Sequence, residues 1–150
     1  MTQKQQEMTA LIREIRTAFN RLKAIAEALH ADLEVNPSMR AVLQALVSKA
    51  PQTVPEIAKE RGVSRQHVQK VMNVLLKSGL VHAEDNPDHK RSDFYRPTPS
   101  GERVFAEIQT RELEPMSKLA DALPEREIIA ATQLLAQMNE MIETITITGE

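Results

Sequence analysis

The sequence predicts a mainly α-helical protein with one small β-hairpin, and three observations lead to this prediction. Of the 150 residues, 41% are hydrophobic but only 3% are aromatic, so the core must be built from aliphatic side chains, which favours helices over an all-β fold. Apolar residues recur every three or four positions through most of the chain. The exception lies between residues 80 and 97, where two strand-like segments flank a turn rich in Asn, Pro and Asp.

Long amphipathic helices are expected at both ends of the chain. In the first, from Thr2 to about Glu34, the apolar positions continue through several heptads. Two more helices follow the hairpin, one from about Pro99 to Leu123 and one that begins at Pro124 and ends in a frayed tail, TITITGE. The small central region cannot bury the apolar stripes of both termini. We therefore expect these stripes to cover one another across a two-fold interface.

Three shorter helices in the central region are marked by their capping residues. Asn36 can cap the first, and Ser64 can cap the third. Gly62 can adopt the positive φ that a tight turn between the second and third helices requires. We expect helices over residues 38–49, 55–61 and 64–78, followed by strands over residues 80–84 and 93–96.

The segment IAKERGVSRQHV, residues 57–68, has the pattern of a helix-turn-helix. Small Ala58 allows the two helices to approach closely, Val63 fills the corner, and Val68 is the first buried anchor of the second helix. That helix has an apolar side formed by Val68, Val71, Met72, Leu75 and Leu76. Its opposite side carries Arg65, Gln66, Gln69, Lys70, Asn73 and Lys77. Gln and Asn suit adenine edges, and Arg and Lys suit guanine or phosphate, so this polar side predicts contact with DNA.

The distribution of charge supports a polyanionic partner for the central region. The whole chain has a net charge of −2, but residues 38–82 carry seven Lys or Arg against two Glu, a local charge of +5. Residues 101–150 carry four Lys or Arg against ten acidic residues, a local charge of −6. Local charge sets the field that a polyanion meets, so the basic centre is compatible with nucleic-acid binding despite the acidic total.

The hairpin contains a longer motif, DHKRSDFYRPTPSG, at residues 88–101. In this motif, and in its order of long helix, helix-turn-helix, hairpin and two further helices, the chain resembles the MarR family of bacterial regulators. The family usually has Asp, one residue, Arg, and then five residues before Leu-Thr and a Pro-x-Gly. Arg91 matches the family's wing arginine, and residues 98–101 match the end of the motif.

Two positions depart from the family pattern. His89 stands where the family usually has the aspartate that holds the wing arginine, and Pro97 replaces the leucine. The sequence leaves open whether Asp88 or Asp93 supplies this Asp–Arg brace instead. Pro97 has no backbone N–H to donate, so we expect the second strand to be short.

The resemblance implies a homodimer that presents two winged helices to double-stranded DNA. One integrated domain would contain an N-terminal dimerisation helix (1–36), a winged helix-turn-helix DNA-binding region (37–100) and C-terminal dimerisation helices (101–150). The recognition helix would enter the major groove, with the wing beside it. The candidate DNA-binding residues are Ser64, Arg65, Gln66, His67, Gln69, Lys70 and Asn73 in the recognition helix and His89, Lys90 and Arg91 in the wing.

Several other classes of protein are disfavoured. The absence of cysteine excludes disulfides and thiolate metal sites, and the histidines share no metal-ligand spacing, so we expect no metal or other cofactor. The chain has no Gly-rich phosphate loop and no recognisable catalytic motif, so we do not expect an enzyme. No apolar run approaches the ~20 residues of a membrane span, and the amino terminus has no hydrophobic signal core, which indicates a cytoplasmic protein.

These observations together predict a sequence-specific transcription regulator that binds an inverted-repeat operator as a homodimer, with a repressor favoured over an activator. A small-molecule effector that relieves binding is compatible with the resemblance, but the sequence identifies neither an effector nor the operator and its target genes. The alternative is a winged-helix protein-interaction module without sequence-specific DNA binding, in which the polar side of the recognition helix docks on a partner protein.

Overall fold

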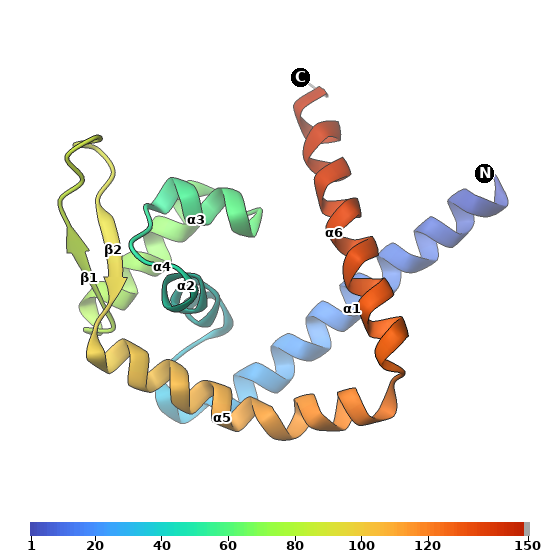
Figure 1. Ribbon diagram of the computed structural model, residues 1–150, viewed down its shortest axis with the longest axis horizontal. Coiled ribbons are helices and arrows are strands. Elements are labelled where there is room, and N and C mark those ends of the chain that lie inside the picture. The colour runs from blue at the N-terminus through green and yellow to red at the C-terminus, as the bar shows by residue number, and fades with distance from the viewer. Residues whose placement is uncertain (149–150) are drawn as a thin grey trace. The chain divides into compact units, whose positions relative to one another are not determined.

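The computed structural model describes residues 1–148, and its helices and strands follow the predicted order (Figure 1). The mainly α-helical fold class with a single hairpin is therefore confirmed. Among the helices of residues 1–148, none combines the length and the hydropathy that a membrane span requires. The elements are α1 (Gln3–His30), a 3-10 turn η1 (Ala31–Leu33), α2 (Pro37–Ser48), α3 (Val54–Arg61), α4 (Arg65–Lys77), β1 (Val81–Glu84), β2 (Phe94–Pro97), α5 (Pro99–Ala122) and α6 (Glu125–Thr148).

The two terminal helices end at positions different from those predicted. α1 stops at His30, and the chain then turns at Glu34, whose φ of 57° is left-handed. The prediction of a frayed tail from residue 144 onward was also wrong, because α6 continues to Thr148. Within this helix the hydroxyl of Thr144 donates to the Met141 carbonyl at 2.6 Å, a bond that a Thr side chain can form in a helix. Gly149 and Glu150 lie outside the described residues.

The chain divides into two compact units inside α5. The first unit runs from Met1 to Arg111, and the second begins at Glu112 and contains the rest of α5 and α6. The buried hydrophobic residues form one core, which lies in the first unit and draws most of its side chains from α2, α3 and α4. On α4, Val68, Val71, Met72 and Leu75 are buried as predicted, whereas Leu76 is only partly buried.

Side-chain caps fix the starts of α2 and α4. Asn36 accepts a hydrogen bond from the Met39 backbone N–H at 2.8 Å, and Ser64 accepts one from the His67 N–H at 3.0 Å. Gly62 ends α3 with a φ of 66°. The predicted helix-turn-helix is therefore present, with both the cap and the positive φ in the expected places.

Buried Gln52 joins the end of α2 to the hairpin. Its side-chain amide donates to the carbonyls of Ala45 and Lys49, both at 2.8 Å. Its backbone exchanges two hydrogen bonds with Tyr95 of β2, at 3.2 and 2.9 Å. The hairpin is therefore held by the segment that precedes α3, in addition to the pairing of its own strands. No pattern in the sequence predicted this contact.

The start of α5 lies directly against the residues that connect α4 to β1. The Thr98 hydroxyl donates to the Gly79 carbonyl at 2.6 Å, and the Thr98 backbone N–H donates to the Leu80 carbonyl at 3.0 Å. Gly101 approaches the same carbonyl so closely that an added Cβ would lie 2.0 Å from the Leu80 oxygen. The glycine of the TPSG motif is therefore required by this close backbone contact.

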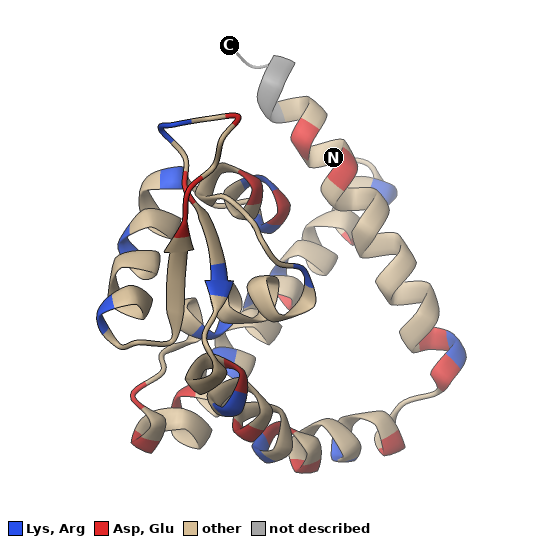
Figure 2. Ribbon diagram, turned by 60° about the vertical axis from the view of Figure 1, so that its left-hand side comes forward, with Lys and Arg blue, Asp and Glu red and all other residues tan. Residues whose placement is uncertain are grey.

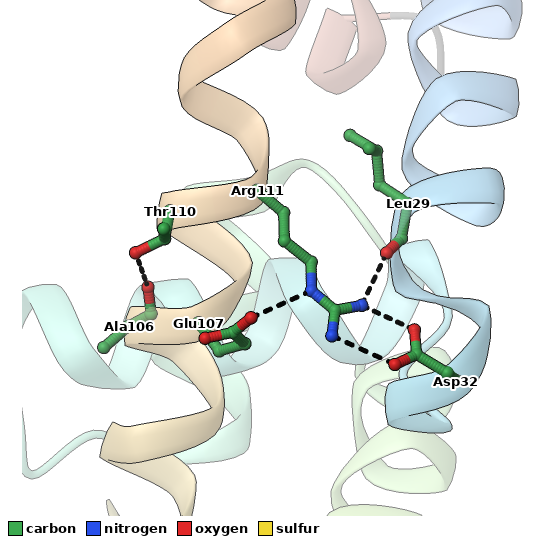
Figure 3. Close-up of polar contacts among 6 residues, drawn as sticks. All are labelled: Leu29, Asp32, Ala106, Glu107, Thr110 and Arg111. Carbon is green, nitrogen blue, oxygen red and sulfur yellow. Dashed lines mark hydrogen bonds and ion pairs between the residues drawn. The ribbon is translucent and has the colours of Figure 1, made fainter.

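Arg111 joins α5 to the end of α1 (Figure 3). Its Nη1 donates to the Leu29 carbonyl at 2.9 Å and also contacts the Asp32 carboxylate, to which Nη2 donates at 3.0 Å. Its Nε donates to Glu107 at 3.1 Å. The guanidinium holds the pKa of the Asp32 carboxyl below its usual value, and the two acidic partners raise the pKa of Arg111. This cluster ties the long first helix to the core.

Gly101→Ala should destabilise the first unit by about 1–3 kcal/mol, because the new Cβ would overlap the Leu80 backbone. A loss of stability would be informative, because replacing Gly with Ala normally stabilises a helix by about 1 kcal/mol. Urea unfolding measures the effect, and Gln109→Ala on an exposed position of the same helix is the control. A Gly101→Ala variant as stable as the wild type would contradict the close contact.

Asp32→Asn should lower the stability of the protein at neutral pH but not in acid. Because the folded-state pKa of Asp32 is lowered, its contribution is present above the unperturbed pKa of 3.8 and is lost as the pH falls through the lowered folded-state pKa. Thermal unfolding curves of wild type and variant should therefore differ at pH 7 and converge in acid. Glu27→Gln, on an exposed position of α1, is the control. If the difference in unfolding temperature between wild type and Asp32→Asn did not change with pH, the carboxylate charge of Asp32 would not be its cause.

Candidate nucleic-acid interface

A polar hollow of about 550 Å³ lies between the exposed side of α4, the tip of the hairpin and the start of α3. In Figure 1 the hairpin stands beside these helices and its tip extends beyond them. We call the hairpin β1–β2 with its tip the wing. The hollow is lined by Val54, Pro55, Arg65, Gln66, Gln69, Lys90, Arg91, Ser92, Asp93 and Tyr95.

Five of the ten predicted site residues come together in this hollow. Arg65, Gln66 and Gln69 reach it from α4, while Lys90 and Arg91 reach it from the wing tip. The other five predicted residues are also exposed but do not line the hollow: Ser64, His67, Lys70, Asn73 and His89. The hollow thus combines three cationic side chains with two amides, which can donate to phosphates and to base edges.

Two amides on the exposed side of α4 are hydrogen-bonded to each other. The Nε2 of Gln69 donates to the Oδ1 of Asn73 at 2.9 Å, one helical turn away. The pair keeps further donors and acceptors for another molecule, because each amide group has both. Ser64 differs from these residues, since its hydroxyl oxygen already caps α4. Its role in the structure is to begin the helix.

The wing has a structured tip. The side chain of buried Asn86 accepts from the Asp88 backbone N–H at 3.1 Å, and its carbonyl accepts from the His89 N–H at 3.3 Å. Arg91 forms no hydrogen bond or ion pair with Asp88 or Asp93 among the described residues. Neither of the two acids considered in the sequence therefore replaces the missing Asp–Arg brace.

The ion pairs of the wing lie further down, on its paired strands. The carboxylate of Glu84 in β1 accepts a hydrogen bond from the Nε of Arg96 at 2.8 Å and lies 3.1 Å from the Nε2 of His82. The Arg96 hydrogen bond, followed by that of His82, lowers the pKa of the Glu84 carboxyl. β2 is short, as predicted from the missing proline N–H, but it runs over Phe94–Pro97 instead of the predicted residues 93–96.

Sequence reasoning missed half of the hollow's lining. Val54 and Pro55 come from the start of α3, and Tyr95 comes from the returning strand, so no spacing rule along α4 could include them. Ser92 and Asp93 were within the wing motif and could have been found by extending the candidate set past Arg91. Asp93 is the only acidic residue among the hollow's described lining.

Charge on this part of the molecule is mostly basic along α4 and mixed on the wing. Figure 2 shows Lys and Arg positions along α4, and both signs of charge at the wing tip. In the described part of the chain, no group of three or more His, Asp and Glu side chains is placed to hold a metal ion. The chemistry available here is therefore charge-assisted and amide hydrogen bonding.

Comparison with known proteins identifies relatives of both the sequence and the fold. The sequence model of the MarR family matches residues 35–92. An uncharacterized protein of Mycobacterium tuberculosis is 33% identical over 132 residues, which cover 88% of this chain and 92% of that protein.

Two solved structures share the fold. A mutant MarR from E. coli, complexed with operator DNA, matches with a TM-score of 0.77 at 20% identity, covering 88% of this chain and 95% of that one. The transcriptional repressor CouR, bound to a 23-mer DNA duplex, matches with a TM-score of 0.74 at 20% identity, covering 84% and 89%. The chain belongs to the MarR family of winged-helix transcription regulators.

Proposed function

We propose that this protein is a repressor that binds double-stranded DNA sequence-specifically, as a homodimer, on an inverted-repeat operator. The observation that carries the proposal is the polar hollow, which is lined by Arg65 and two amides of α4 together with the two cations of the wing tip. The E. coli MarR bound to operator DNA and the DNA-bound repressor CouR, which share the fold, support it. An effector that relieves binding stays a prediction from the sequence resemblance.

The two sides of the hollow would perform different tasks on DNA. α4 would enter the major groove. There Gln66, Gln69 and Asn73, which is hydrogen-bonded to Gln69, can read adenine edges. Lys70 can contact guanine or phosphate. Lys90 and Arg91 at the wing tip would reach the neighbouring minor groove or its phosphates. Their separate positions on α4 and on the wing suit this division, because a recognition helix and a wing address adjacent grooves.

A second copy of the chain is the proposed partner of the terminal helices. In the second unit no residue from Glu112 to Ile145 is buried, and exposed fractions reach 59% at Leu113 and 64% at Ile145. On α1, Phe19 and Leu22 are exposed by 65% and 54%. Exposed apolar side chains in this number are typical of an interface, and a two-fold dimer supplies the same surfaces from both copies. This gives the terminal regions 1–36 and 101–150 their proposed dimerisation role.

A winged-helix module that binds a protein partner is the alternative function. The exposed side of α4 argues against it, because large apolar or aromatic anchors are typical of protein-binding sites and this side carries Arg65, Gln66, Gln69, Lys70 and Asn73 instead. A mobility shift with random DNA at low salt separates the two functions, since a protein-binding module would not retard the DNA.

The wild-type protein should be a dimer in solution. Light scattering at micromolar concentration should give twice the chain mass of 16.9 kDa. Replacing both Leu22 and Leu135 with Glu should give an unfolded or aggregating chain, because the apolar stripes would lose their cover. Gln133→Glu, an exposed polar position on α6, is the control for added negative charge and should remain dimeric. A wild-type mass of 16.9 kDa would contradict the proposed assembly.

Substitutions in α4 and in the wing should affect binding differently. Gln66→Ala should relax base preference within each half-site, at a cost of about 1–3 kcal/mol against the preferred base. Arg91→Ala should weaken all DNA about equally or change only an A·T preference, because minor-groove readout is degenerate.

Both effects can be measured by selecting bound sequences from a random DNA pool and then titrating the selected sites with each variant. Gln109→Ala on α5 is a matched control outside the hollow. Equal, sequence-independent losses from Gln66→Ala and Arg91→Ala would show that α4 contacts only phosphates.

A further inference from the structure

On one face of the wing, the side chains of Arg96 and His82 both contact the same carboxylate oxygen of Glu84. Arg96 Nε lies 2.8 Å from Glu84 Oε1, and His82 Nε2 lies 3.1 Å from the same oxygen. The register pairs His82 with Arg96 and Glu84 with Phe94, so Glu84 and Arg96 are diagonal neighbours on one face of the hairpin. In Figure 2 the hairpin ribbon carries an acidic position, in red, on β1 and a basic position, in blue, on β2.

Glu84 occupies the last strand pair before the tip. Beyond it the chain enters the loop over residues 85–93, which carries Lys90 and Arg91. Each strand has only four residues, and a two-stranded hairpin of that length is marginal by itself. A cross-strand contact at this point adds to the hydrogen bonds that hold the strands next to the tip.

The acids nearer the tip make no comparable contact. Among the described residues, no ion pair or hydrogen bond involves the carboxylates of Asp85, Asp88 or Asp93, and none involves the side chains of Lys90 or Arg91. The tip cations are thus left for another molecule, while the one acid of the wing that is engaged lies on the strands.

We infer that Glu84 is a positioning residue for DNA binding: by holding Arg96 across the strands it fixes the direction of the tip, so that Lys90 and Arg91 reach the duplex. This inference rests on the proposed function and adds to it a residue that would not touch the DNA. The contact takes the place of a brace within the tip itself. His82 adds a second donor to the same carboxylate oxygen.

Electrostatic repulsion and positioning predict opposite changes in DNA affinity when the charge of Glu84 is removed. Loss of a carboxylate close to DNA normally tightens binding, because repulsion of the phosphates is reduced. Loss of the positioning contact weakens binding, because the tip must then be ordered at the moment of association. His82, Glu84 and Arg96 are exposed by 49%, 37% and 42%, so the contact is solvent-screened and the expected weakening is modest, about two- to fivefold.

The test uses the full-length protein and a site selected from random DNA by the wild type. Glu84→Gln should weaken binding about two- to fivefold in fluorescence anisotropy. Its flanking A·T preference should be reduced, while base preferences read by α4 remain those of the wild type. Asp85→Asn and Asp88→Asn remove the same charge from neighbouring positions without a contact and should bind as tightly as the wild type or more tightly. Thermal unfolding of each variant identifies any general loss of folding.

A second comparison separates positioning from direct contact by Arg96. If Arg96 acts through Glu84, Arg96→Gln and the double variant Glu84→Gln/Arg96→Gln should show about the same loss as Glu84→Gln alone. Additive losses would show that Arg96 contacts DNA itself and would overturn the inference. Tighter binding by Glu84→Gln, as in the two aspartate controls, would overturn it as well. If the wild type bound no DNA at low salt, the proposed function would fail first, and that result is distinguishable from a wild type that binds while Glu84→Gln follows the controls.

Discussion

The close backbone contact between Leu80 and the start of α5 is the constraint on which the site depends. The Leu80 carbonyl accepts from the Thr98 N–H at 3.0 Å, and Gly101 is the residue that lets the helix come this near. Leu80 follows α4, and Thr98 follows β2, so one contact fixes the base of the wing relative to the recognition helix. Arg65 of α4 and the two cations of the wing tip line one hollow in this arrangement.

The rest of the first unit reinforces that geometry from other directions. Gln52 holds β2 by its backbone and the end of α2 by its side chain. Arg111 ties α5 to the end of α1 through Leu29 and Asp32. Each of these connections joins segments distant in sequence, and each uses hydrogen bonds that are satisfied inside the protein. The exposed side of α4, by contrast, keeps donors and acceptors available to a partner.

Local signals in the sequence were sufficient for the elements but insufficient for their connections. The caps Asn36 and Ser64 and the turn glycine Gly62 act within a few residues, so pattern reasoning located the helices around them. The contacts of Gln52 with Tyr95 and of Glu84 with Arg96 depend on which strands meet and in which register, and no single segment encodes that. The same limit explains why candidate residues of α4 and of the wing line the hollow, while Val54, Pro55 and Tyr95 line it too but were not candidates.

The central claim is that two winged helices, related by two-fold symmetry, neutralise the phosphates of one inverted repeat. The most direct measurement is the affinity for a selected site across a series of salt concentrations, by fluorescence anisotropy. If about six to ten phosphates are neutralised, log K should fall against log salt with a slope of roughly −5 to −9, on a site whose half-sites lie about 10 base pairs apart. A flat salt response, or tight binding of one chain to a single half-site, would contradict the account.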